Sequence, residues 1–192
     1  MLFRSSFRKL LVAPVTLRRG MEALIQREID HARAGRGGHI RAKMNSLVDP
    51  AIIALLYEAS NAGVQIDLVV RGMCSLRPGL PGISETIRVV SVIGRFLEHS
   101  RIFWFGNGGE DEVFLGSADW MPRNLDRRVE AVAPIEDAGH RQQLQQLIEL
   151  YLQDTTAWHM QSDGSFLQIQ PEDEGQAIQT ILMQRWRGGL KP

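Results

Sequence analysis

Apolar residues near the start of the chain recur every three or four positions, which is the spacing of an amphipathic helix. The pattern predicts a helix that Thr16 caps and that runs to about Ala34, with Gly35 at its end. The apolar face of this helix comprises Met21, Leu24, Ile25 and Ile29. Residues 39–45 then alternate between apolar and polar side chains, which predicts a strand.

The order of helix and strand then repeats. Asp49 and Pro50 supply an N-cap and a first-turn proline, so a second helix is expected to continue to Gly63. Residues 64–70 are apolar except at two positions, as in a strand buried on both faces. This succession predicts parallel strands joined by right-handed crossovers, with ligands at the carboxyl ends of the strands.

The middle of the chain is predicted to hold short strands and one long helix. Two Pro-Gly pairs within residues 72–85 indicate a loop. The strands expected after it are 87–92, 101–106, 112–117 and 128–133. Asn107-Gly108-Gly109 predicts a hairpin turn, and the apolar spacing over 137–154 predicts an amphipathic helix.

The character of the sequence changes after Gly164. A short strand over 166–169 and a helix over about 172–186 are expected there, separated by acidic residues. We therefore divide the chain into a domain of residues 1–164 and a C-terminal tail of residues 165–192.

Composition narrows the classes of protein. The chain has 192 residues, enough for one well-packed domain, and its 22 basic and 22 acidic side chains cancel. No overall field then attracts nucleic acid, so local clusters must bind any anion. A single cysteine, Cys74, excludes an internal disulfide and favours a reducing, cytoplasmic location. No apolar run approaches the roughly 20 residues that span a bilayer.

His99 and Arg101 are the strongest candidates for chemistry. In an alternating strand, positions 99 and 101 point to the same side. Histidine can act as a nucleophile or as an acid and base near neutral pH, and arginine binds phosphate oxygens with a planar fork of donors. This pair therefore indicates phosphoryl chemistry. The alternative is a histidine that only completes the core.

Further donors lie where other predicted strands end. Arg71 precedes Gly72, which would let the backbone approach a ligand, although a structural ion pair is the alternative. Lys43 and Asn45 point the same way from the neighbouring strand, to line a phosphate site or only to cap the strand. The segment after the last hairpin strand adds Ser117, Arg123 and Asn124. Such donors suit the negative charge of phosphoryl transfer.

Several other residues have weaker cases. Glu130 is a candidate to orient His99, whereas Glu98 is expected on the opposite face of the strand. Arg127 and Arg128 would extend a positive track or form a solvated surface pair. The remaining histidines are expected to be solvated; they are His31, His39, His140 and His159. No cluster of residues with metal-ligand spacing is found in the sequence.

The order His-x-cation, Gly-Ser-Ala-Asp-Trp, Arg-Asn and Glu resembles the second half-site of the phospholipase D superfamily. Arg101 stands where lysine is usual, and residues 102–106 lack the usual acid. Four runs resemble more closely the C-terminal region of bacterial polyphosphate kinases that use a phosphohistidine. These runs are Lys43–Asp49, Val69–Cys74, Arg95–His99 and Ser117–Met121, within a resemblance from about Leu10 to Gly164.

This resemblance implies an α/β fold, with a phospholipase-D-like mixed sheet flanked by helices. It implies reversible transfer of the ATP γ-phosphate to polyphosphate through a phosphohistidine that lies outside this chain. His99 would contact ATP and assist proton transfer, and Arg71 would bind ATP. Mg²⁺ would accompany ATP on ligands outside this chain.

The expected partners are ATP or ADP, polyphosphate, and either the preceding kinase domains or further copies of the chain. No nucleic-acid partner is expected, and the sequence leaves open a peripheral association with membranes. One alternative is a non-catalytic module that binds ATP or polyphosphate. Another is a phosphodiesterase of lipase or nuclease type, which Arg101 and the missing acid disfavour.

Overall fold

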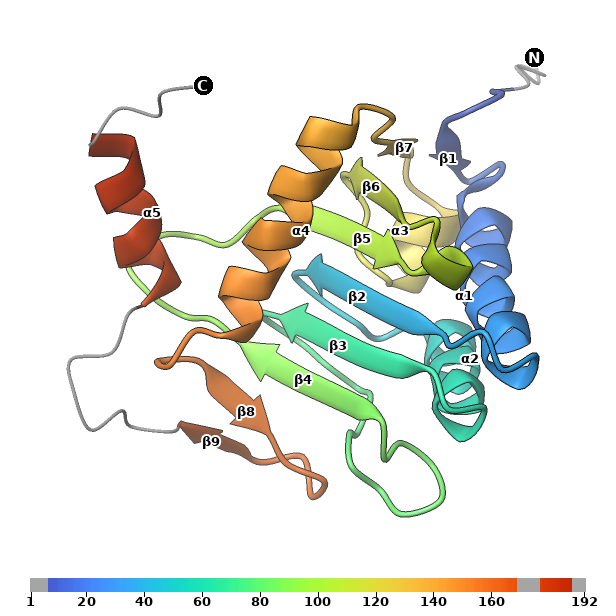
Figure 1. Cartoon of the computed structure of the whole chain (residues 1–192), viewed down its shortest axis with the longest axis horizontal. Helices are drawn as coiled ribbons and strands as arrows, with labels where there is room; N and C mark the ends of the chain where they lie inside the picture. Colours follow the sequence, from blue (N-terminus) through green and yellow to red (C-terminus); the bar gives the residue numbers. More distant parts are fainter. Residues whose placement is uncertain (1–6, 169–176, 188–192) are drawn as a thin grey trace.

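A computed structural model describes residues 7–168 and 177–187 of the chain. The strands of this part form one sheet in the order β1-β7-β6-β5-β2-β3-β4-β8-β9 (Figure 1). The strands are β1 (Leu11–Ala13), β2 (His39–Met44), β3 (Gln65–Val70), β4 (Ile87–Ser91), β5 (Arg101–Phe105), β6 (Glu112–Gly116), β7 (Glu130–Pro134), β8 (Trp158–Met160) and β9 (Phe166–Gln168). The helices are α1 (Leu17–Arg33), α2 (Pro50–Asn61), α3 (Pro122–Asp126), α4 (Ala138–Leu152) and α5 (Ile178–Arg187), with a 3₁₀ turn, η1 (Asn107–Gly109), between β5 and β6.

The sheet is mixed and is flanked by helices, as expected. β2, β3 and β4 are parallel, and every other pairing is antiparallel. The predicted crossover from β2 through α2 to β3 is present. A loop without a helix joins β3 to β4, so the parallel arrangement is confined to the centre of the sheet.

Alternation along β2 separates the two faces of the sheet. Ile40, Ala42 and Met44 lie in the larger core, which α1 and α2 cover. On the opposite face, which α4 covers, Lys43 lies against the ring of Tyr151. Figure 1 shows α4 crossing in front of the sheet and α1 and α2 behind it. Because each face has its own apolar cover, the central strands are buried on both sides.

The predicted helix starts differ in how they are capped. The Asp49 side chain accepts a hydrogen bond from the amide of Ile52 at 3.0 Å, so the predicted N-cap of α2 is confirmed. The N-cap predicted at Thr16 is wrong in its contacts. Its hydroxyl instead accepts from the amide of Val12, at 2.9 Å, and makes no bond to α1.

Three of the shortest elements were not predicted. β1 and β8 have three residues each and α3 has five, which is too few to show a period. β7 also starts at Glu130 rather than near 128, because the amides of Arg127 and Arg128 fold back onto the carbonyl of Arg123. The hairpin turn predicted at 107–109 is present as the 3₁₀ turn η1.

The C-terminal tail contributes to both the sheet and the α4 face. The strand predicted at 166–169 is present as β9, which pairs with β8 at the end of the sheet. The helix predicted from about 172 is present from Ile178, and residues 172–176 lie outside the described part. Ile178 is fully buried in the same core as α4. Among the helices that the structure describes, none has the length and apolarity to cross a membrane.

Candidate functional site

The predicted site residues gather at one edge of the sheet, which we call the carboxyl edge because β2 and β3 end there. Lys43 and Asn45 lie at the end of β2, and Arg71 directly follows β3. β5 runs antiparallel to β2, so its first residue, Arg101, lies at the same edge. β6 ends there at Gly116, just before Ser117.

Arg101 joins His99 to a carboxylate that the sequence prediction missed. Its Nε and Nη2 atoms donate to the two oxygens of Asp119, each at 3.1 Å. Its Nη1 atom contacts Nδ1 of His99 at 2.9 Å and donates to the carbonyl of His99 at 2.7 Å. Because a guanidinium only donates, Nδ1 accepts in this arrangement. The ion pair is buried, whereas the imidazole that it supports is exposed.

His99 and Arg101 are in contact, as predicted, but not because they alternate along one strand. The alternation of a strand cannot apply to position 99, because β5 begins at Arg101 and residues 92–100 form an irregular segment. The two side chains meet because the guanidinium folds back along its own strand. Glu98, expected on an opposite strand face, is likewise outside any strand and is buried.

Asp119 also connects His99 and Arg101 to two further predicted residues. Its Oδ1 atom accepts from the amide of Asn45 at 2.8 Å. The side-chain oxygen of Asn45 in turn accepts from Nε of Arg71 at 3.0 Å. A buried arginine requires a carboxylate partner, so Arg101 itself was the signal that could have identified Asp119.

Arg71 is a predicted cation that keeps donors for a ligand although its side chain is held in place. Its side chain is held through Nε, and its Nη atoms make no hydrogen bond or ion pair with the described residues. Gly72 is also needed for packing within the protein. A Cβ atom there would lie 3.0 Å from the carbonyl oxygen of Asn45, which accepts from the Gly72 amide at 2.7 Å. The glycine therefore allows two loops to meet.

Ser117 and Asn124 are tied to Glu130. The serine hydroxyl donates to one carboxylate oxygen, and the Asn124 amide donates to the other at 2.6 Å. Both oxygens of Glu130 are thus engaged, and within the described part of the chain Glu130 makes no hydrogen bond to His99. Arg123, on α3, is exposed, and its side chain makes no hydrogen bond or ion pair with the described residues.

Lys43 lies beneath the site rather than on its surface. Its Nζ atom is 3.2 Å from a carboxylate oxygen of Glu98 and donates to the hydroxyl of Ser100 at 2.8 Å. Only 1% of the residue is exposed. Burial lowers the pKa of Lys43, although the charge of Glu98 opposes that effect.

Some side chains are less free than the sequence suggested. His39, expected to be solvated, is 3.1 Å from Asp67 and meets the edge of the Trp104 ring. His31 accepts a hydrogen bond from Arg36 at 2.9 Å.

The single cysteine is not reactive. Burial raises the pKa of Cys74 to about 11, so the side chain is almost entirely in the thiol form at neutral pH.

The residues that the structure describes do not fit a Mg²⁺ site. Magnesium requires carboxylate oxygens that are free to coordinate it. The carboxylates at the carboxyl edge already accept hydrogen bonds from protein donors; they are Glu98, Asp119 and Glu130. Within the described residues, no three histidine, cysteine or acidic side chains group as metal ligands would.

Comparison with solved structures defines the class of fold. The phospholipase D family member Nuc from Salmonella typhimurium is 16% identical, with a TM-score of 0.53 over 73% of this chain and 90% of that one. The two proteins share a fold, in which a mixed sheet is flanked by helices.

More similar proteins identify the family. The sequence model described as polyphosphate kinase C-terminal domain 2 matches residues 10–179. The chain therefore belongs to the family of polyphosphate kinase C-terminal domains. The polyphosphate kinase of Parasynechococcus marenigrum strain WH8102 is 67% identical over 97% of this chain and 27% of its own length. The crystal structure of the Porphyromonas gingivalis polyphosphate kinase is 40% identical, with a TM-score of 0.89, over 95% of this chain and 28% of that one. The chain thus spans about a quarter of these relatives.

Proposed function

We propose that this chain is the nucleotide-binding C-terminal part of an ATP–polyphosphate phosphotransferase. The observation that carries the proposal is the exposed imidazole of His99, held by Arg101 and Asp119. Asp119 also accepts a hydrogen bond from Asn45, which in turn accepts one from Nε of Arg71. The Nη atoms of Arg71 could therefore bind anionic oxygens. An imidazole beside a guanidinium suits a phosphate that must be held while a proton moves.

In the proposed reaction, the bond between the β- and γ-phosphates of ATP breaks, ADP leaves, and the γ-phosphoryl group passes to a histidine outside this chain. It then passes from that histidine to the terminal phosphate of polyphosphate, and both steps are reversible. His99 would donate or accept the proton, and Arg71 would hold the nucleotide phosphates. Ser117 and Arg123 would face the polyphosphate chain, and the buried Asn124 would act through Glu130, to which its amide donates. Mg²⁺ would accompany ATP and take its protein ligands from the remainder of the polypeptide.

The roles of Lys43 and Arg101 follow from their contacts. Arg101 has its fork engaged by Asp119, so we propose that its phosphate interaction is confined to the side shared with His99. Lys43 would affect phosphate binding indirectly, because it holds Glu98 and Ser100 on either side of His99. The proposed partners are ATP, ADP, polyphosphate and the preceding domains, in the cytoplasm.

A non-catalytic module that binds ATP or polyphosphate is the second candidate. It is favoured by the Nη atoms of Arg71, which make no hydrogen bond with the described residues and could bind an anion without any phosphoryl transfer. Phosphodiester hydrolysis is not favoured, because Arg101 replaces the usual lysine and its guanidinium is bound to Asp119.

The purified chain tests the proposal directly. We expect it to bind γ-labelled ATP in the presence of Mg²⁺, and the His99→Ala variant to bind about tenfold more weakly. His140→Ala is the matched control, because 72% of that side chain is exposed and it lies on α4. Binding would be measured by calorimetry, and label transfer to short polyphosphate by chromatography.

The outcomes separate the candidates. Transfer that His99→Ala abolishes would show that the chain completes a site alone or by self-association. Binding without transfer would place the missing histidine in the remainder of the polypeptide. If polyphosphate binds equally well to both variants and neither transfers label with that remainder added, the non-catalytic module is correct. A chain that binds neither ligand would contradict both candidates.

A further inference from the structure

Glu98 is buried even though it precedes the exposed His99 in the sequence. Its carboxylate is paired with side chains from three elements that are distant in the chain. Tyr151 of α4 donates at 2.6 Å, Gln179 of α5 donates at 2.7 Å, and Lys43 of β2 lies 3.2 Å away. A buried carboxylate with three donors is fixed in position, because losing any donor would leave it incompletely paired.

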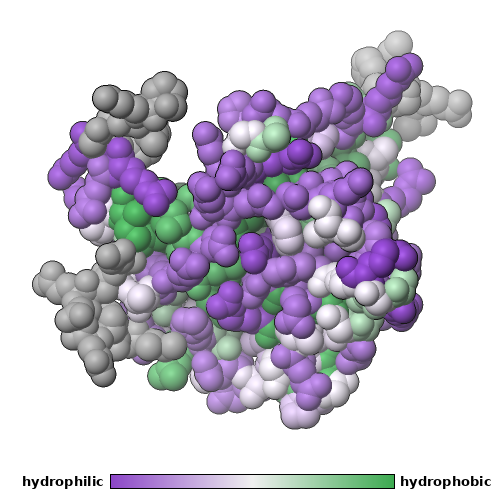
Figure 2. Space-filling model, viewed as in Figure 1, coloured by the Kyte–Doolittle hydropathy of each residue, from purple (hydrophilic) through white to green (hydrophobic). Residues whose placement is uncertain are grey.

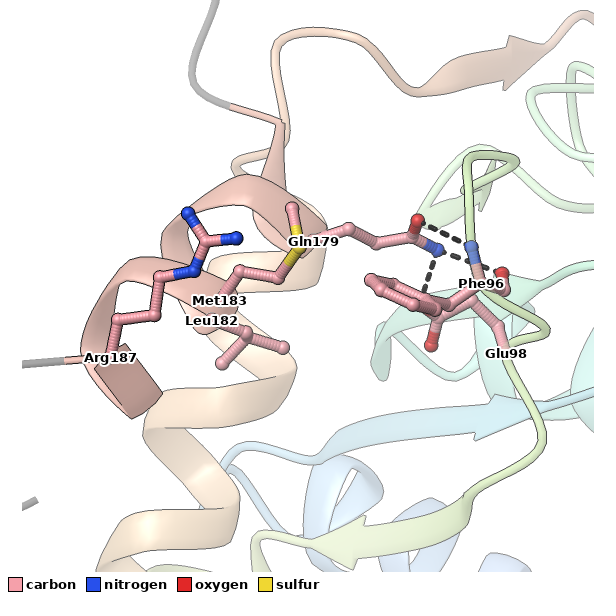
Figure 3. Close-up of a pocket in the computed structure, with 6 residues that line it drawn as sticks. All are labelled: Phe96, Glu98, Gln179, Leu182, Met183 and Arg187. Carbon is pink, nitrogen blue, oxygen red and sulfur yellow. Dashed lines mark hydrogen bonds between the residues drawn. The ribbon is translucent and has the colours of Figure 1, made fainter. Parts of the chain in front are cut away.

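Gln179 also holds the backbone of the same segment. Its side-chain oxygen accepts from the amide of Phe96, and its nitrogen donates to the carbonyl of Phe96, both at 2.9 Å. Figure 3 shows the side chain reaching from α5 to Phe96 and Glu98 together. A Cβ atom at Gly94 would lie 2.5 Å from the Gln179 side-chain oxygen, so the glycine is needed for this approach.

The contact between α5 and this segment depends on these polar bonds more than on apolar packing. A pocket of about 400 Å³ separates them, lined on the α5 side by Leu182, Met183 and Arg187. Figure 2 shows apolar residues gathered between α4 and α5 on a face that is otherwise mostly hydrophilic. Phe96 and Leu97 are 49% and 66% exposed, so apolar burial contributes little to fixing the segment.

The two residues that flank His99 in the sequence, Glu98 and Ser100, are therefore both fixed by buried side chains. Glu98 is held by the three donors, and the hydroxyl of Ser100 is held by Lys43 at 2.8 Å. The residues between them and β4 form no regular secondary structure that could do this instead. The position of the imidazole thus depends on side chains from β2, α4 and α5.

We propose that Gln179 is a positioning residue for His99, acting through Glu98 and the backbone of Phe96, with Tyr151 supporting the same carboxylate. The inference rests on the proposed function for its consequence in nucleotide binding. It assigns to α5, near the end of the chain, control over the geometry of the site. Lys43 belongs to the same buried network.

The test uses the full chain and the nuclear magnetic resonance signals of its five histidine rings. Gln179→Met keeps the length of the side chain and removes its hydrogen bonds. We expect the His99 ring signals to shift or broaden, while those of His31 and His39, at the opposite edge of the sheet, stay in place. ATP binding should weaken about two- to tenfold. Thr180→Val, at an exposed position on the same helix, is the matched control.

Tyr151→Phe provides a second variant, which removes one donor to Glu98 and keeps the ring against Lys43. It decides the question if Gln179→Met fails to fold. His99 signals that stay unchanged in the folded variants, or that move equally in Thr180→Val, would overturn the positioning role. The ring signals do not depend on ATP. If the unmodified chain does not bind ATP, the proposed function is contradicted, but the ring signals can still show whether Gln179 positions His99.

Discussion

The donors at the carboxyl edge differ in how much of their hydrogen-bonding capacity remains for a ligand. Arg101 is engaged by Asp119 and His99, and the Asn124 amide is engaged by Glu130. Arg71 retains its Nη atoms. Asp119 and Glu130 therefore orient the donors of the site, and fewer groups, such as the Nη atoms of Arg71, remain able to bind an anion. This arrangement offsets part of the cost of keeping a guanidinium buried.

Asp119 is expected to stabilise the fold as well as orient the site. Asp119→Asn leaves the Arg101 guanidinium buried without a charged partner, so the free energy of unfolding should fall by about 3 kcal/mol. Asp30→Asn is the matched control, because Asp30 lies on the exposed face of α1. It should change stability by no more than about 0.5 kcal/mol. Urea unfolding measures both, and equal effects of the two variants would contradict the prediction.

At the scale of elements, one buried cap connects three helices. The carboxylate of Asp49 caps α2 and accepts two hydrogen bonds from Arg18 of α1, at 3.1 and 2.6 Å. Arg18 also donates to Asp126 of α3 at 2.6 Å. α3 carries Arg123 and Asn124, so this ion cluster ties the predicted polyphosphate donors to the first two helices.

Replacing that cap should cost more than replacing an exposed one. Asp49→Ala removes the cap and leaves Arg18 with fewer partners, so we expect a loss of about 2–4 kcal/mol. Asp137→Ala is the matched control, because Asp137 caps α4 through the amide of His140 at 2.8 Å but is 65% exposed. That variant should lose about 1 kcal/mol. Similar losses in urea unfolding would show that burial adds nothing.

The same cap makes stability depend on pH. Burial alone would raise the pKa of Asp49, but hydrogen bonds from Arg18 and the Ile52 amide hold it below the usual value. A depressed pKa contributes stability that is present above the unfolded value of about 3.9 and is lost as the pH falls through the lower folded value. Asp49→Asn should therefore lose less stability than the unmodified chain between about pH 5 and pH 3, as measured by thermal unfolding.

At the scale of the whole molecule, a net charge of zero leaves anion binding to local groups. Arg127 and Arg128 are exposed beside the donors of α3, in the turn that leads into β7. Two exposed arginines at another place on the surface, Arg33 and Arg36, allow a comparison at equal total charge. The position of charge, rather than its amount, should decide polyphosphate binding.

The double variant Arg127→Gln/Arg128→Gln should bind polyphosphate more weakly and with less dependence on salt. The slope of log K against log salt concentration should fall by about 0.7 for each phosphate that the protein no longer neutralises. Arg33→Gln/Arg36→Gln should leave both quantities unchanged. Titrations at several salt concentrations measure the slope. An equal loss in the two double variants would mean that total charge, not the track beside α3, attracts the chain.

The sequence by itself determined the longer elements and the family. The apolar period of α1, the Asp49-Pro50 start of α2 and the apolar run of β3 depend on neighbours a few residues away, so they can be found in a single chain. Four motifs, including those around His99 and Ser117, carried the resemblance, and the match of the family model over residues 10–179 confirmed the family. Several donors of the site could be named because they lie at or just beyond the ends of predictable strands, as Asn45, Arg71 and Ser117 do.

Tertiary structure alone decided how those donors are held. The bond from Gln179 to Glu98 joins residues 81 positions apart, and the pair of Arg101 with Asp119 joins residues 18 apart. No local period encodes such contacts. The first forms when α5 lies against the segment 92–100, and the second when β5 pairs with β6. The irregular segment 92–100 shows this most clearly, since its conformation is fixed by side chains from three other elements.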